Sequence, residues 1–157
     1  MLPAADQVKA AIERALPGIV ISLEGSTLIV DANDIIRVCQ FFKTDRDYAL
    51  DYLANLTAVD YPPERIEVVY HLYSMAKKHG PVAIRVKLPR ATPVVASLTK
   101  LYRGAEFQER EAWDLFGVQF EGHPDLRRIL MWEGFEGHPM RKDYKPEDQD
   151  QLEQTAK

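Results

Sequence analysis

The chain has 157 residues, a length that suits one globular domain with a short appendage. Hydrophobic residues make up 46% and charged residues 28%, and the net charge of −4 lacks the basic excess that nucleic-acid-binding proteins usually carry. Cys39 is the single cysteine, so the chain excludes an internal disulfide and an iron–sulfur cluster held by several of its own thiolates. No run approaches the roughly 18 apolar residues of a membrane-spanning helix, and the N-terminal residues show no pattern of a secretory signal or transit peptide.

The N-terminal third predicts two helices around a hairpin. Asp6 to Leu16 places apolar residues at helical spacing, which indicates an amphipathic helix. Ile19–Leu23 and Thr27–Val30 flank a turn-forming Glu-Gly-Ser sequence, which predicts a β-hairpin. Asn33 is suited to begin a second helix. The apolar stripe of that helix holds Ile35, Ile36, Val38, Cys39 and Phe42, so we expect Cys39 to be a small core residue.

The middle of the chain reads mainly as strands. Apolar or alternating runs, each bounded by turn-forming residues, lie at Tyr48–Asp60, Ile66–Ser74 and Val82–Leu88. Two helices are predicted after them, at Val94–Leu101 and Ala105–Phe116, and Gly117 is placed to end the second. Helices grouped before and after a run of strands predict an α+β fold, with a mixed or antiparallel sheet and helices packed on it.

After Gly117 neither a helical nor a strand period persists. This stretch is rich in glycine and proline, yet it is not typical of disorder because it contains many large apolar residues: Ile129, Leu130, Met131, Trp132, Phe135, Met140 and Tyr144. We therefore predict a compact domain over residues 1–117 and an extended C-terminal arm over 118–157 that docks on a partner. Burial of these side chains in the chain's own core is the alternative interpretation.

The most highly charged segment is the predicted helix that precedes the arm. Glu109, Glu111 and Asp114 suggest an acid/base set, and hence a soluble enzyme. However, Arg110 lies one helical turn from both Glu106 and Asp114, so we expect it to pair with them and to lower the carboxylate pKa values. A lowered pKa is unsuited to a general acid near neutrality, and no nucleophile or metal ligand accompanies the set, which disfavours catalysis.

The arm combines arginines with apolar residues. Arg127 and Arg128 directly precede Ile129, Leu130 and Met131. Basic and acidic residues are nearly balanced between residues 123 and 145, which disfavours binding to a phosphate backbone. Aromatic and arginine anchors beside apolar side chains are typical of protein interfaces. A solvated loop with incidental arginines remains the plainer alternative.

The same residues resemble a known family signature. The pattern consists of Glu109-Arg110-Glu111, Asp114-Leu115-Phe116, His123, Arg127 and Ile129-Leu130 at their observed spacing. It is similar to the signature of the thirty-kilodalton subunit of respiratory complex I, which in bacteria is the C subunit of NADH:quinone oxidoreductase. Gly137 to Tyr144 and Leu56 to Tyr61 resemble further segments of that family, so the likeness runs from about residue 50 to residue 145.

The resemblance implies a non-catalytic structural and assembly subunit of the peripheral arm of complex I. It implies a compact α+β domain with an extended C-terminal arm and no cofactor in this chain; FMN, iron–sulfur clusters and quinone are expected in partner subunits. The implied partners are the quinone-site subunit of the forty-nine-kilodalton type (the D subunit) and neighbouring iron–sulfur subunits, with no nucleic acid and no membrane span. The implied location is peripheral, on the cytoplasmic face of the bacterial inner membrane.

By the same resemblance, twelve residues are expected either to brace the fold or to contact a partner. They are Glu109, Arg110, Glu111, Asp114, His123, Arg127, Arg128, Trp132, Arg141, Lys142, Asp143 and Tyr144. The electron donor is not encoded in this chain. The equivalent subunit of a membrane-bound hydrogenase, or of a quinone reductase that uses ferredoxin or a deazaflavin, is therefore the main alternative.

Overall fold

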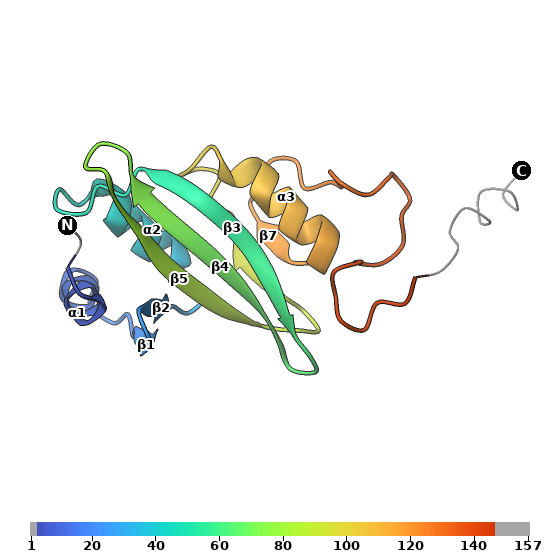
Figure 1. Ribbon diagram of the computed structural model, residues 1–157, viewed down its shortest axis with the longest axis horizontal. Helices are drawn as coiled ribbons and strands as arrows, with labels where there is room; N and C mark the ends of the chain where they lie inside the picture. Colours follow the sequence, from blue (N-terminus) through green and yellow to red (C-terminus); the bar gives the residue numbers. More distant parts are fainter. Residues whose placement is uncertain (1–2, 147–157) are drawn as a thin grey trace, which may run out of the picture.

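Five strands form the main sheet of the computed structural model, which describes residues 3–146. The strand order is β1-β2-β5-β4-β3, and every neighbouring pair is antiparallel except β2 and β5, which are parallel (Figure 1). The strands are β1 (Ser22–Glu24), β2 (Thr27–Ile29), β3 (Tyr52–Tyr61), β4 (Arg65–Ser74) and β5 (His79–Pro89). The sheet is therefore mixed, which confirms the predicted α+β class.

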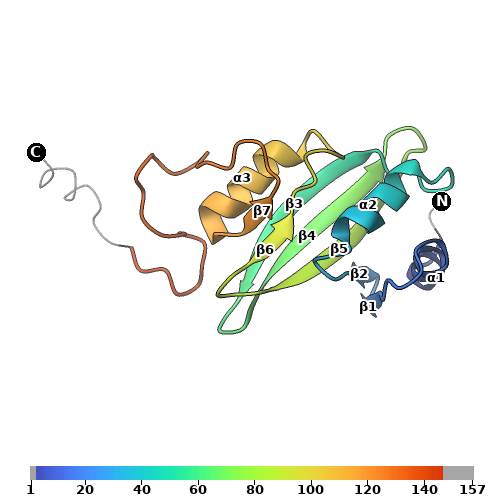
Figure 2. The same ribbon diagram turned by 180° about the vertical axis from the view of Figure 1, so that it is seen from behind.

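The core lies on one face of this sheet. In β4, Ile66, Val68, Tyr70 and Leu72 alternate along the strand and are fully buried, as the period of two of a strand requires. The predicted N-terminal helix is α1 (Ala5–Ala15), and the second is α2 (Ile35–Thr44), which lies over the inner face of the sheet (Figure 2). Each large apolar side chain buried there contributes about 1.5–3 kcal/mol to the stability of the fold.

Cys39 belongs to this core, as predicted. It is fully buried on α2, and burial raises the pKa of its thiol well above the usual range. The start of α2 differs from the prediction. Asp34, not Asn33, precedes the first helical residue, while the backbone and side-chain N–H groups of Asn33 donate to the carboxylate of Asp31 in the preceding turn.

A second, two-stranded sheet was not predicted. The segment expected to form a helix over 94–101 instead forms β6 (Val94–Ala96) followed by turns, and β6 pairs in parallel with β7 (Gln119–Glu121). The helix prediction was wrong because β6 depends on a partner more than twenty residues further along the chain. The branched side chains of Val94 and Val95 suit a strand once that partner is present.

Helix α3 spans Ala105–Phe116 and ends at Gly117, whose φ of 77° is left-handed, so this prediction is confirmed. Just beyond the expected domain boundary, Val118 and Phe120 are buried in the core. From residue 122 to 146 the structure describes neither helix nor strand. This segment, called the arm below, leaves the body beside α3 at the end opposite α1 and loops back (Figures 1 and 2).

Candidate interface on the C-terminal arm

The arm caps the C-terminus of α3. The last four carbonyls of any α-helix lack partners within the helix, and they carry the negative end of its dipole. Here the carbonyl of Trp113 accepts from the N–H of Gly117, and the carbonyls of the next three residues accept from the arm. Asp114 O accepts from His138 Nδ1 (3.0 Å) and Arg128 Nη1 (3.1 Å), Leu115 O from Met140 N (3.0 Å), and Phe116 O from Arg141 Nε (2.6 Å).

Asp114 binds the backbone of the arm through its carboxylate. Its Oδ2 accepts from the N–H groups of Ile129 (3.0 Å), Leu130 (2.8 Å) and Met131 (2.9 Å), while Oδ1 lies 2.5 Å from Arg128 Nη1. Burial raises the pKa of this carboxyl, but the three N–H groups and the guanidinium outweigh that effect and hold the pKa below its ordinary value. Asp114 is therefore an ionised anchor for the arm.

Arg128 holds the arm together from within. Its Nη2 donates to the carbonyls of Phe135 (2.7 Å) and Gly137 (2.9 Å), in addition to the bonds to Asp114. Its guanidinium also lies over the rings of Trp113 (5.6 Å) and Phe135 (5.2 Å). Arg128 is thus an internal brace.

Arg127 has a different environment. Its side chain is 71% exposed and pairs with the half-exposed Asp125 through Nε, at 2.9 Å. Nothing in the sequence separates the two arginines, whereas the structure distinguishes an inner residue from an outer one.

The predicted pairing of Arg110 with Glu106 and Asp114 is wrong. Arg110 is buried, and it donates to the backbone carbonyls of Arg127 (3.1 Å) and Arg128 (3.0 Å). The reason is that the arm covers this face of α3. The N–H groups of the arm donate to the Asp114 carboxylate, and the carbonyls of the arm accept from Arg110. The helical spacing of the sequence does not predict either set of bonds.

Glu109 lies in a buried polar cluster. It accepts from Ser97 Oγ (2.6 Å) and from the N–H of Leu98 (2.6 Å), and His123 Nε2 lies 4.0 Å away. The imidazole of His123 also bonds the carbonyl of Glu106 (2.9 Å) and the N–H of Asp125 (3.0 Å), which fixes the start of the arm against α3. The part played by Ser97 was not predicted, because this residue lies in the segment expected to be helical.

The three candidate acid/base residues do not form one site. Burial raises the pKa of Glu109 more than its hydrogen bonds from Ser97 and Leu98 lower it. Asp114 has a lowered pKa and a saturated carboxylate, and Glu111 is exposed to solvent. Carboxylates in three separate environments offer no shared substrate position, which argues against the enzyme alternative.

The far end of the arm is tied to the sheet by a charged clamp. Arg90, just after β5, pairs with Asp60 of β3 (Nε–Oδ1 2.7 Å) and with Asp143 of the arm (Nη2–Oδ1 2.6 Å). Asp60 also accepts from the N–H of Lys142 at 2.8 Å. The hydrogen bonds from Arg90 hold the pKa of Asp60 below its ordinary value. Nothing local in the sequence predicted the part played by Asp60 or Arg90.

Four large apolar side chains of the arm remain exposed. Their exposed fractions are 37% for Ile129, 56% for Leu130, 51% for Trp132 and 56% for Met140. The rings of Phe135 and Tyr144 stack with their centroids 6.1 Å apart, and the ring of Trp132 meets that of Phe135 edge to face with the centroids 4.7 Å apart. The arm therefore fastens its polar groups and inner aromatic rings to α3 and to itself, and presents apolar side chains outward.

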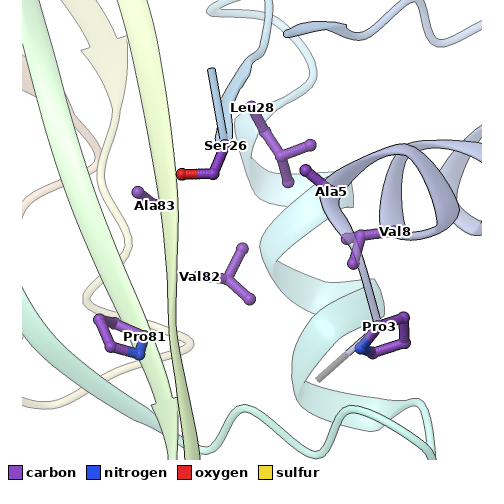
Figure 3. Close-up of a pocket in the computed structure, with 8 residues that line it drawn as sticks. All are labelled: Pro3, Ala5, Val8, Ser26, Leu28, Pro81, Val82 and Ala83. Atoms are coloured by element: carbon purple, nitrogen blue, oxygen red, sulfur yellow. The ribbon is translucent and has the colours of Figure 1, made fainter. Parts of the chain in front are cut away.

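Two hollows differ in what they offer a ligand. One, of about 210 Å³, lies between α1, β2 and β5 and is lined by apolar side chains such as Val8, Leu28 and Val82, with no titratable group (Figure 3). The other, of about 330 Å³, lies between α3 and the arm. Its lining residues are Trp113, Arg127, Arg128, Met131, Glu133 and Gly134.

Among residues 3–146 no cluster of three or more His, Cys, Asp or Glu side chains is placed to hold a metal ion. Within the same range no helix is long and apolar enough to cross a membrane.

Comparison with known proteins identifies the family. Residues 28–150 match the family model described as the 30 kDa subunit of the respiratory-chain NADH dehydrogenase. The chain belongs to this family. The resemblance found in the signature residues of α3 and the arm is therefore confirmed.

Curated relatives carry matching names. A C subunit of NADH-quinone oxidoreductase from Rhizobium meliloti is 48% identical over 117 residues, which cover 73% of this chain and 63% of the relative. The corresponding C subunit of Moorella thermoacetica is 49% identical over 119 residues, covering 75% and 78%. The chain thus spans somewhat less than two thirds of the length of the Rhizobium meliloti relative.

Two solved structures share the fold. A structure named as the trypsin-resistant fragment (1–134) of Nqo5 matches with a TM-score of 0.62 and 29% identity, covering 79% of this chain and 100% of that one. A chain of an archaeal membrane-bound sulfane sulfur reductase matches with a TM-score of 0.73 and 22% identity, covering 98% and 91%. At that identity the second likeness shows the fold alone.

Proposed function

We propose that this chain is a non-catalytic assembly subunit in the peripheral arm of a proton-translocating NADH:quinone oxidoreductase. The observation that carries the proposal is the outward apolar surface of the arm, formed by Ile129, Leu130, Trp132 and Met140, in a chain of the 30 kDa subunit family. Apolar side chains on an otherwise well-bonded segment are typical of a surface that a partner covers. The role is to hold neighbouring subunits in position, and the redox chemistry belongs to those subunits.

The proposed partner of the arm is the forty-nine-kilodalton-type subunit that helps form the quinone site, with iron–sulfur subunits of the peripheral arm nearby. The proposed location is the cytoplasmic face of the bacterial inner membrane, as part of the complex. FMN, the iron–sulfur clusters and quinone are assigned to the partners. The names of the relatives from Rhizobium meliloti and Moorella thermoacetica support this parent complex over a hydrogenase.

Affinity purification tests the parent complex. The tagged chain is expressed in the organism that encodes it. Its membranes are solubilised with a mild detergent, and the subunits that copurify with the tagged chain are identified by mass spectrometry. We expect the quinone-site subunit together with flavin- and NADH-binding subunits. Retention of hydrogenase subunits or of a deazaflavin protein in their place overturns the assignment, as does recovery of the chain alone.

Limited proteolysis tests the docking of the arm. Arg127, Lys142 and Lys145 are exposed basic residues in the arm and so are accessible to trypsin in the isolated chain. The Nqo5 structure is named as a trypsin-resistant fragment and covers 79% of this chain, which supports a resistant body with trypsin-sensitive residues outside it. We expect trypsin to cut the arm in the isolated chain and to leave it intact in the complex. Equal cutting rates in the two states contradict docking through the arm.

A further inference from the structure

The hollow between α3 and the arm combines an apolar wall with an exposed cationic side chain. Trp113 and Met131 line it, and Arg128, which also lines it, already donates through both terminal amino groups to Asp114 and two backbone carbonyls. Arg127 lies at the same hollow with 71% of its side chain exposed. Among residues 3–146 the hydrogen bonds of its side chain run from Nε to Asp125, which leaves the two terminal amino groups of this exposed side chain available to a partner.

We infer that this hollow is the receptor for one carboxylate side chain of the subunit on which the arm docks. The inference rests on the proposed function and names the chemistry of its central contact. The guanidinium of Arg127 offers two parallel N–H groups, the geometry that matches a carboxylate. Trp113 and Met131 provide the apolar surroundings in which such a bond is strong, because a docked partner excludes water from them.

The remaining N–H donors of Arg127 favour an acidic occupant over a basic one. Asp125 neutralises Arg127 only through Nε, and Asp125 is itself half exposed. Glu133, which also lines the hollow, raises the pKa of Arg127 but makes no ion pair with it. The hollow of about 330 Å³ has room for a carboxylate side chain and part of its apolar neighbour. The exposed Leu130 and Trp132 flank Met131 in the sequence, so the site is continuous with the outward apolar surface of the arm.

Zero-length cross-linking tests the inference directly. A carbodiimide joins a lysine amine to a carboxylate only when the two are in contact, so the Arg127→Lys variant is assembled into the complex and treated with it. The wild-type chain has no amine at this position and is the matched control. We expect mass spectrometry to find position 127 joined to an aspartate or glutamate of the partner subunit.

A photo-cross-linker placed at Trp132 in a separate variant reports whether the arm contacts the partner at all. If position 132 links to the partner while position 127 links only to Asp125 or Glu133 of its own chain, or to nothing, the inference is overturned and the proposed function stands. If neither position links to a partner, both are overturned.

Charge reversal supplies an independent measurement. We expect Arg127→Glu to lower the amount of partner retained by roughly tenfold or more, because the new carboxylate at position 127 then faces the carboxylate of the partner. Arg103→Glu reverses an exposed arginine near the opposite end of α3 and serves as the control. Equal retention of the partner by the two variants overturns the inference.

Discussion

At the scale of single residues, Asp114 makes several hydrogen bonds to the arm. One carboxylate accepts three consecutive backbone N–H groups and the guanidinium of Arg128, and the carbonyl of the same residue accepts from His138 and again from Arg128. Donors converging on a buried anion are costly to leave unpaired, since their own hydration has already been lost. The identity of this side chain therefore controls whether the arm stays in place.

We expect Asp114→Asn to lower the free energy of unfolding by about 2–4 kcal/mol, because an amide nitrogen would face N–H donors and Arg128 would lose its counter-charge. Urea denaturation of the isolated chain measures the change. Glu111→Gln, an exposed change on the same helix, is the control and should shift stability by less than about 0.5 kcal/mol. Equal effects of the two substitutions contradict the anchoring role.

Gly117 is required for two separate reasons. Its φ of 77° strains any other residue, and a Cβ there would lie 2.6 Å from His138 Cδ2 and 3.0 Å from Arg141 Nη2. We expect Gly117→Ala to cost about 2–3 kcal/mol, against about 1 kcal/mol for Gly25→Ala. Gly25 also has a positive φ (61°) but open space around it, so the comparison isolates the contact with the arm. Equal unfolding free energies for the two variants count against close packing of the arm.

At the scale of elements, the C-terminus of α3 and the arm depend on each other. The helix leaves carbonyls and a negative dipole end, and the arm provides donors and two cationic side chains, Arg128 and Arg141. The arm has no helical or strand hydrogen bonds of its own, so these bonds to the end of α3 hold it in one conformation. The Arg90 clamp then fixes its far end to β3.

The cap should weaken in mild acid because of His138. Burial lowers the pKa of this histidine below 6.5, and the nearby Arg141 and Arg128 act in the same direction. The stability it contributes is therefore present above pH 6.5 and lost as the pH falls through the folded-state pKa. The lowered pKa of Asp114 acts in the same sense but only below about pH 4, whereas the raised pKa of Glu109 acts in the opposite sense.

We expect hydrogen exchange in residues 138–146 to accelerate between pH 7.5 and 5.5, after correction for the intrinsic rate. His138→Asn isolates the cause, because an amide can replace the Nδ1 donor to Asp114 without titrating. The acceleration should be much smaller in that variant. The same pH response in both proteins would assign it to another group.

At the scale of the whole molecule, folding and docking use different residues. The core includes side chains of α1, α2, α3 and the inner face of the sheet, while four of the exposed large apolar side chains, Ile129, Leu130, Trp132 and Met140, lie on the arm. Loss of an exposed side chain removes little buried area from the isolated chain, but it removes contact area from an assembled complex. Stability and assembly should therefore respond to different substitutions.

We expect Leu130→Ser and Met140→Ser to change the unfolding free energy of the isolated chain by less than about 1 kcal/mol, yet to reduce the abundance of the assembled complex. Phe42→Ala, in the core, should instead cost about 3–5 kcal/mol in isolation. Calorimetry on the isolated chain and native gels of membranes measure the two effects. Normal assembly of the arm variants contradicts the proposed docking surface.

Much of the fold followed from local patterns. Apolar spacing predicted α1, the β1–β2 hairpin, α2 and the three long strands, because each of these elements buries one face whose period is visible along the chain. Helix α3 and its end at Gly117 were predicted for the same reason. The family signature in α3 and the arm was also readable directly, as a spacing of residue types.

The tertiary structure alone decided the partners of those residues. Three features join segments far apart in the chain. They are the pairing of β6 with β7, the hydrogen bonds of Asp114 to the arm backbone where a pair with Arg110 was expected, and the Asp60–Arg90–Asp143 clamp. Helical and strand periods report only neighbours a few residues apart, so they determine which faces are apolar and where elements end. Which donor meets which acceptor depends on how the chain folds back on itself, and that arrangement separates the inner Arg128 from the outer Arg127.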